Sequence, residues 1–192
     1  MRCKAPDKQF YRELTDLNEE FLMLVATAGA GASFLGLDAP IRSALGELSR
    51  PKLQFIAETP CLLAGFTLLP PALAAREEPP GFSVMESAWM DSARMFSAAL
   101  LTYLWQMARR NQLNAALCIG ASADHIGRFA GISFHDIQSR AASAVYQLEA
   151  RFCHQPRFWR DLIRAAHHGN SIVQRISRLT SIPLALADQR PL

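Results

Sequence analysis

The sequence lacks a hydrophobic run long enough to cross a bilayer. Its most apolar stretch, residues 96–107, is shorter than the roughly 20 residues of a spanning helix and is interrupted by Ser97, Thr102 and Gln106. The first ten residues are polar, which predicts that no secretory leader is present. We therefore expect a cytoplasmic protein with no membrane association.

Cysteine is also scarce, and none of the four cysteines forms a C-x-x-C pair, which predicts free thiols rather than a disulfide scaffold. Motifs for zinc proteases, serine hydrolases, phosphate-binding loops and dinucleotide sites are missing. The histidines lack the closely spaced ligand pairs of zinc sites. We expect no metal, no other cofactor and no enzymatic activity; the rival, a small helical enzyme, would need a pocket with clustered acids or histidines.

Long β-branched runs are absent, whereas alanine and leucine are abundant, which favours helix over strand. Half of the residues are hydrophobic and 19% are charged, so a buried core is expected. Prolines cluster in residues 68–83 and predict a connector between a helical unit at 1–67 and a second unit at 84–192. The expected fold is an all-α helical bundle.

Charge is distributed unevenly along the chain. Residues 1–91 contain 8 basic and 12 acidic residues, whereas residues 92–192 contain 12 and 5. All twelve basic residues of the second part are arginines, which suit bidentate contacts with phosphates and base edges. A solvated helical surface rich in arginine would have the same composition.

Apolar spacing and capping residues place the expected helices. An amphipathic helix is expected over 10–28, ending near Gly29-Ala30-Gly31. Asp38 and Ser49 are N-cap candidates for two short helices, each with proline in its first turn. In the second unit we expect an apolar stripe over 96–107, N-caps at Ser122 and Ser133, a capping box from Ser133 to Asp136, and helices over 157–168 and Ser171–Leu179.

The two units share a repeated segment. A shift of 84 residues superimposes residues 35–57 on 119–141 without a gap. The identical pairs are Gly36/Gly120, Ala39/Ala123, Ser49/Ser133, Gln54/Gln138 and Ala57/Ala141. Each copy reads as two short capped helices joined by a few residues, which is the outline of a helix-turn-helix. Two ordinary helical hairpins with similar caps remain the alternative.

The first copy resembles FlhD, a subunit of the bacterial flagellar master transcriptional regulator. The resemblance covers residues 16–66. It is carried by Asp16-Leu17-Asn18, Phe21-Leu22-Met23-Leu24, Leu35-Gly36-Leu37, Leu45, Leu48, Pro51, Leu53, Ala57-Glu58-Thr59, Leu62 and Phe66.

The resemblance implies an all-helical subunit that forms a homo- or hetero-oligomer, pairs with an FlhC-like partner, and activates transcription on promoter DNA with RNA polymerase. Related pairs activate transfer genes of conjugative elements. The chain departs from the family in its short Gly/Ala-rich segment before Leu35 and in its second, diverged copy. The four-cysteine zinc site of the FlhC-like partner is absent from this sequence.

Helix N-termini and arginines are the expected DNA contacts, because free N–H groups and cations attract phosphate. The candidates are Arg42, Arg50, Lys52, Arg128, Arg140, Arg157, Arg160 and Arg164. The apolar faces of 10–28 and 96–107 are the expected association surfaces, unless an internal core absorbs both. The rival without DNA binding is a helical interaction module, either an adaptor or an anti-regulator.

Overall fold

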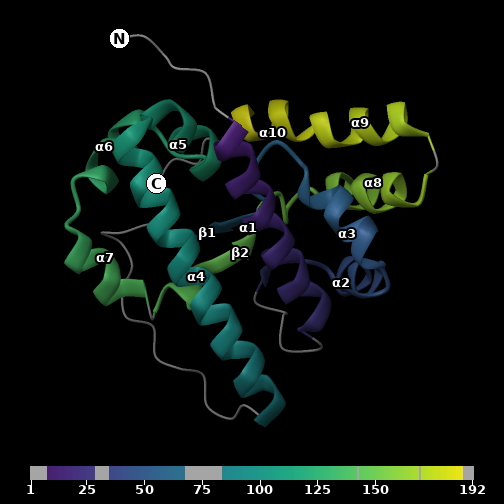
Figure 1. Cartoon of the computed structure of the whole chain (residues 1–192), viewed down its shortest axis with the longest axis horizontal. Helices are drawn as coiled ribbons and strands as arrows, with labels where there is room; N and C mark the ends of the chain where they lie inside the picture. The colour runs from purple at the N-terminus through teal and green to yellow at the C-terminus, as the bar shows by residue number, and fades with distance from the viewer. Residues whose placement is uncertain (1–7, 29–34, 68–83, 142, 169, 188–192) are drawn as a thin grey trace.

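The computed structural model describes residues 8–28, 35–67, 84–141, 143–168 and 170–187 (Figure 1). Its helices are α1 (Lys8–Thr27), α2 (Ala39–Gly46), α3 (Arg50–Ala57), α4 (Val84–Arg110), α5 (Gln112–Ile119), α6 (Ala123–Ala130), α7 (Phe134–Ala141), α8 (Pro156–His167), α9 (Ser171–Leu179) and α10 (Ser181–Ala187), with the 3-10 helix η2 (Ala144–Gln147). The expected helical fold is confirmed. Two strands, β1 (Ala64–Phe66) and β2 (Leu148–Ala150), were not expected.

The repeat extends well beyond the segment that the sequence indicated. When 84 is added to the residue numbers, the bounds of α2, α3 and β1 coincide with those of α6, α7 and β2. The end of α1 then lies within one residue of the end of α4. Gly36 and Gly120 both have positive φ, at 77° and 73°, a conformation that favours glycine. Thr59 and Ser143, also equivalent, each donate a hydroxyl hydrogen bond to the carbonyl three residues earlier.

A pseudo-twofold axis relates the two copies, and it passes through the strand pair. β1 and β2 are antiparallel, and Gly65 pairs with its own repeat equivalent, Glu149. The flanking hydrogen bonds are symmetric as well. The amide of Thr67 donates to the carbonyl of Gln147 and that of Arg151 to Leu63, both at 2.8 Å. The chain therefore folds as two copies of one unit that face each other, as subunits do in a twofold dimer.

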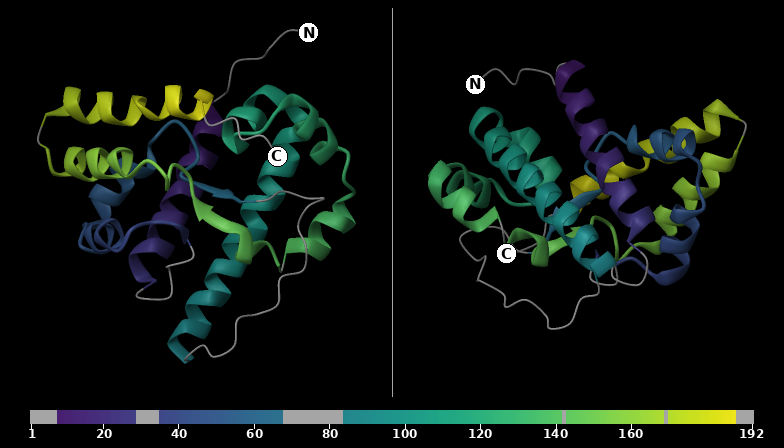
Figure 2. Two further views of the ribbon diagram at one scale, coloured as in Figure 1. Left: turned by 180° about the vertical axis from the view of Figure 1, so that it is seen from behind. Right: turned by 60° about the horizontal axis from the view of Figure 1, so that its bottom comes forward.

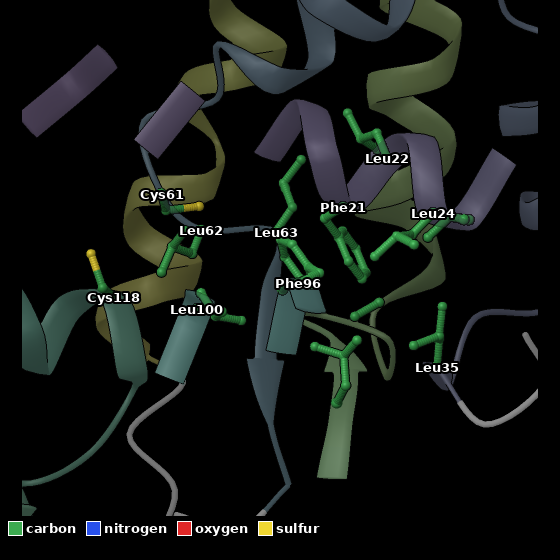
Figure 3. Close-up of a cluster of buried hydrophobic side chains, with 14 of the residues drawn as sticks. Phe21, Leu22, Leu24, Leu35, Cys61, Leu62, Leu63, Phe96, Leu100 and Cys118 are labelled. Atoms are coloured by element: carbon green, nitrogen blue, oxygen red, sulfur yellow. The ribbon is translucent and has the colours of Figure 1, made fainter. Parts of the chain in front are cut away.

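The two copies share one hydrophobic core. Phe21 of α1 and Phe96 of α4 are fully buried and stack at 5.9 Å between ring centroids. Figure 3 shows that side chains of α1, α4 and the residues before β1 point into this cluster. The expectation that the apolar faces of 10–28 and 96–107 are association surfaces is corrected, because both faces lie in the core of the chain itself.

Within this core, Asn18 joins α1 to the turn between α3 and β1 through hydrogen bonds. Its side chain is fully buried. Its amide nitrogen donates to the carbonyls of Ala57 and Cys61 at 3.0 and 2.9 Å. Its carbonyl oxygen accepts a hydrogen bond from the amide of Leu63 at 2.8 Å. Asn18 thereby satisfies backbone groups of the turn between α3 and β1 that cannot reach water.

Helices α8, α9 and α10 follow the second copy. α8 packs against α2 and α3 of the first copy through a buried face that includes Trp159 and Leu162. The indole of Trp159 donates to the carbonyl of Arg151 at 3.0 Å. α9 runs back along α8, and α10 continues in line with α9 (Figures 1 and 2).

Several details differ from the sequence expectations or lie outside the described residues. α5 and α10 were not expected, and α4 begins twelve residues before the apolar stripe at 96–107. The connector at 68–83 and the glycines after α1 lie outside the described residues. None of the described helices is both long and apolar enough to cross a membrane.

Candidate nucleic-acid interface

The two short helix pairs lie where the capping residues predicted them. Asp38, Ser49 and Ser122 occupy N-cap positions, although none of the three side chains makes a capping hydrogen bond. Ser133 does cap its helix, because its hydroxyl oxygen accepts a hydrogen bond from the amide of Asp136 at 3.1 Å. The same hydroxyl donates to the Asp136 carboxylate at 2.6 Å. Three residues separate the helices in each pair, so both adopt the expected layout of two helices joined by a tight turn.

The cations of the first pair differ in how freely they face solvent. The side chain of Arg50 is 81% exposed and pairs with Glu19 of α1 at 3.3 Å. Lys52 is half-buried, and its Nζ lies 2.9 Å from Nδ1 of His167 on α8. Arg42 is half-buried and donates to the carbonyl of Leu37 at 2.6 Å. Arg50 is therefore the most accessible of these three cations.

Arg157, Arg160 and Arg164 lie on the face of α8 opposite its buried residues. Their spacing of three and four residues places them along one side of the helix. Arg157 and Arg164 are 95% and 77% exposed, and both pair with Asp161, at 3.7 and 3.2 Å. Exposed pairs of this kind are weak and exchange readily for other anions.

Packing brings six of the eight candidate residues onto neighbouring helices. α8 lies against α2 and α3, and the contact between Lys52 and His167 joins α3 to α8. Arg128 and Arg140 lie apart from them, on α6 and α7 beyond the strand pair (Figure 1). The candidates thus divide into a larger group on α2, α3 and the adjacent α8, and a smaller group on α6 and α7.

Repeat equivalence does not relate the cations of the two groups. A shift of 84 residues carries Arg42 to Ile126, Arg50 to Phe134 and Lys52 to Asp136. Arg128 and Arg140 correspond to Ala44 and Ile56. The two helix pairs therefore share a backbone layout but present different side chains.

Two further arginines belong to these surfaces and were not candidates. Arg109 at the end of α4 lies over the ring of Trp105 at 4.8 Å, and Trp105 contacts exposed Phe134 at the start of α7. Arg178 of α9 pairs with Glu58 and lies over the ring of Phe55 at 4.8 Å. Arg109 and Trp105 lie four residues apart on one helix, whereas the contacts of Trp105 with Phe134 and of Arg178 with Glu58 and Phe55 join segments distant in the chain, which no sequence signal indicated.

The described core contains a titratable thiol whose pKa is shifted by burial. Burial raises the pKa of Cys118 to about 12. Cys118 lines a cavity of about 100 Å³ together with Cys61, Phe10 and Ile182. Cys61, Cys118 and Cys153 form no disulfide among the described residues. Among the residues with described positions, no three histidine, cysteine, aspartate or glutamate side chains are grouped so that they could hold a metal ion.

No protein-family model, curated protein or solved structure matches the chain.

Proposed function

We propose that this chain is a DNA-binding subunit of a transcriptional regulator. One observation carries the proposal: a pseudo-twofold axis relates two pairs of short helices, α2–α3 and α6–α7, within one chain. Dimeric helix-turn-helix proteins use twofold-related helix pairs to read two half-sites on a duplex. A single chain with this arrangement can approach a duplex with both pairs.

Electrostatics support the same proposal. Helix α8 lies next to the α2–α3 pair and turns its arginine face outward. Two cations of that face, Arg157 and Arg164, pair with one half-buried aspartate, Asp161. Phosphate can replace that aspartate as a partner and would release counterions from the duplex. The different side chains of α2–α3 and α6–α7 suggest a target with two unequal half-sites.

The resemblance of residues 16–66 to FlhD supports a particular assembly. We propose an FlhC-like partner, which would supply the zinc-bearing subunit, and recruitment of RNA polymerase at the promoter. Either a flagellar or a conjugative-element promoter would fit this assembly.

Fluorescence anisotropy with DNA from upstream of the gene tests the proposal, with and without an FlhC-like protein encoded nearby, at two salt concentrations. We expect binding that weakens steeply as salt rises. Replacing both Arg160 and Arg164 by alanine should flatten the slope of log K against log salt by up to about 1.8, because each lost phosphate contact contributes about 0.9. The matched control is Lys8→Ala with Arg12→Ala on exposed positions of α1, which should leave affinity and slope unchanged.

A specific observation favours a second candidate function, an interaction module that never touches DNA. Helix α9 exposes its apolar side chains and buries none of its residues, which is typical of a surface that binds protein. Absent or salt-insensitive DNA binding in every combination of the anisotropy experiment would favour this adaptor over the regulator.

A further inference from the structure

Helix α9 has the reverse of the usual amphipathic orientation, with its polar side chains toward the protein and its apolar side chains toward solvent. The side chains that face the rest of the protein are polar: Gln174 donates to the carbonyl of His168 at 2.8 Å, and Arg178 pairs with Glu58. The apolar side chains point outward and continue along α10. Six apolar side chains of α9 and α10 are between 38% and 66% exposed: Ile172, Val173, Ile176, Leu179, Ile182 and Leu186. We call them the outer stripe.

The outer stripe runs along one nearly continuous rod. α9 ends at Leu179 and α10 begins at Ser181, and Thr180 between them keeps a helical backbone. The amide of Thr180 still donates to the carbonyl of Ile176, four residues earlier, at 3.2 Å. Figures 1 and 2 show the two helices end to end along the edge of the molecule. A helical apolar face of this length in water favours association with another surface.

The spacing of the outer stripe is symmetric about Leu179. Ile176 and Ile182 each lie three residues from Leu179, and Ile172 and Leu186 each lie seven residues away. When two copies of such a helix pack antiparallel about a twofold axis at Leu179, each residue meets the one equally far on the other side. Ile172 then meets Leu186 of the second copy, and Ile176 meets Ile182.

Charge also permits this self-pairing. α9 and α10 contain two cations, Arg175 and Arg178, and no acidic residue. In the antiparallel register, Arg175 is opposite Pro183 and Arg178 is opposite Thr180, so that no two arginines face each other. A parallel pairing would place each arginine beside the same arginine of the second chain, which like-charge repulsion disfavours.

We propose that two copies of this chain associate through the outer stripe, with α9–α10 of one copy antiparallel to α9–α10 of the other and the twofold axis at Leu179. The dimer does not depend on DNA binding and buries an apolar surface that the chain leaves open. Each dimer would contain four copies of the repeated unit.

Sedimentation velocity of the full chain over a wide concentration range tests the dimer. We expect a species of twice the 21.3 kDa mass of the chain. Ile176→Asp should raise the dimer dissociation constant by at least about a hundredfold, because each copy would bury one unpaired carboxylate. Circular dichroism should show an unchanged fold, since Ile176 is exposed. Leu113→Asp on α5 is the matched control, because Leu113 is 55% exposed outside the outer stripe, and it should remain dimeric.

Disulfide trapping tests the register. Leu179→Cys should form linked dimers with itself under mild oxidation, beyond the level of the wild-type chain with its native cysteines. Ile172→Cys should link poorly with itself but efficiently when mixed with Leu186→Cys. A wild-type chain that stays monomeric at every concentration, or a dimer that survives Ile176→Asp, would overturn the proposal. Efficient self-linking of Ile172→Cys would overturn the antiparallel arrangement.

Discussion

Replacing Asn18 by alanine should make the protein unfold at a much lower urea concentration, because this buried side chain holds the turn between α3 and β1. It donates to the carbonyls of Ala57 and Cys61 and accepts from the amide of Leu63. Alanine would leave these three backbone groups without partners inside the core. Each unsatisfied buried group costs about 1–3 kcal/mol, so we expect a loss of about 3–5 kcal/mol after partial relaxation.

Urea unfolding followed by tryptophan fluorescence measures the loss, at one protein concentration for all variants. Thr102→Ala is the matched control, because Thr102 is the repeat equivalent of Asn18 but is only half-buried; its hydroxyl donates to Ala98 of its own helix and accepts one exposed hydrogen bond from Gln138. Its loss should be about 1 kcal/mol or less. Asn18→Asp keeps the shape but cannot donate to carbonyls, and should destabilise at least as much as alanine. A loss below about 1 kcal/mol for Asn18→Ala would refute the reasoning.

The remaining predictions concern glycines, a thiol and a hydroxyl. Gly36→Ala should destabilise by about 1–2 kcal/mol in urea unfolding, because Gly36 has a φ of +77° and an added Cβ would lie 3.2 Å from Cys153. Gly127→Ala should stabilise by about 0.5–1 kcal/mol, because the residue is helical and nothing lies within 4 Å of an added Cβ. Cys118 should react with a disulfide reagent far more slowly than Cys153 until the chain unfolds, because burial raises its pKa to about 12 and only the thiolate attacks; comparable rates in the folded protein would contradict this. Tyr103→Phe should leave stability unchanged or raise it by up to about 1 kcal/mol, because the buried hydroxyl has no hydrogen-bond partner among the described residues; a clear loss in thermal unfolding would count against that account.

Local signals made the short helix pairs predictable. Asp38 and Ser49, each followed by a proline in the first turn, marked the starts of α2 and α3, and each helix begins at the next residue. The repeat was visible over 35–57 because its glycine and caps recur at a fixed distance. The strands were not predictable, since Ala-Gly-Phe and Leu-Glu-Ala are short and have little strand preference, and only the approach of the two copies pairs them.

Long-range packing decided the rest of the candidate site. Arg164 and Asp161 are neighbours on one helix, so their pairing could have been read from their spacing. Arg50 pairs with Glu19, 31 residues earlier, which no local pattern indicates. The apolar stripe of α9 was visible in the sequence, but periodicity alone cannot say whether such a face points inward or outward.

Glu149 opposite Gly65 shows what joining the two copies in one chain allows. In a dimer of identical subunits, a residue on the symmetry axis always meets its own duplicate, so a glutamate there would face a second glutamate in a nearly dry environment. Here the opposite position holds a glycine, and an added Cβ on it would come within 3.1 Å of the Arg151 side chain. Covalent linkage lets each half mutate on its own, so the second half can carry Glu149 and Arg151 while a glycine in the first half leaves room for the Arg151 side chain.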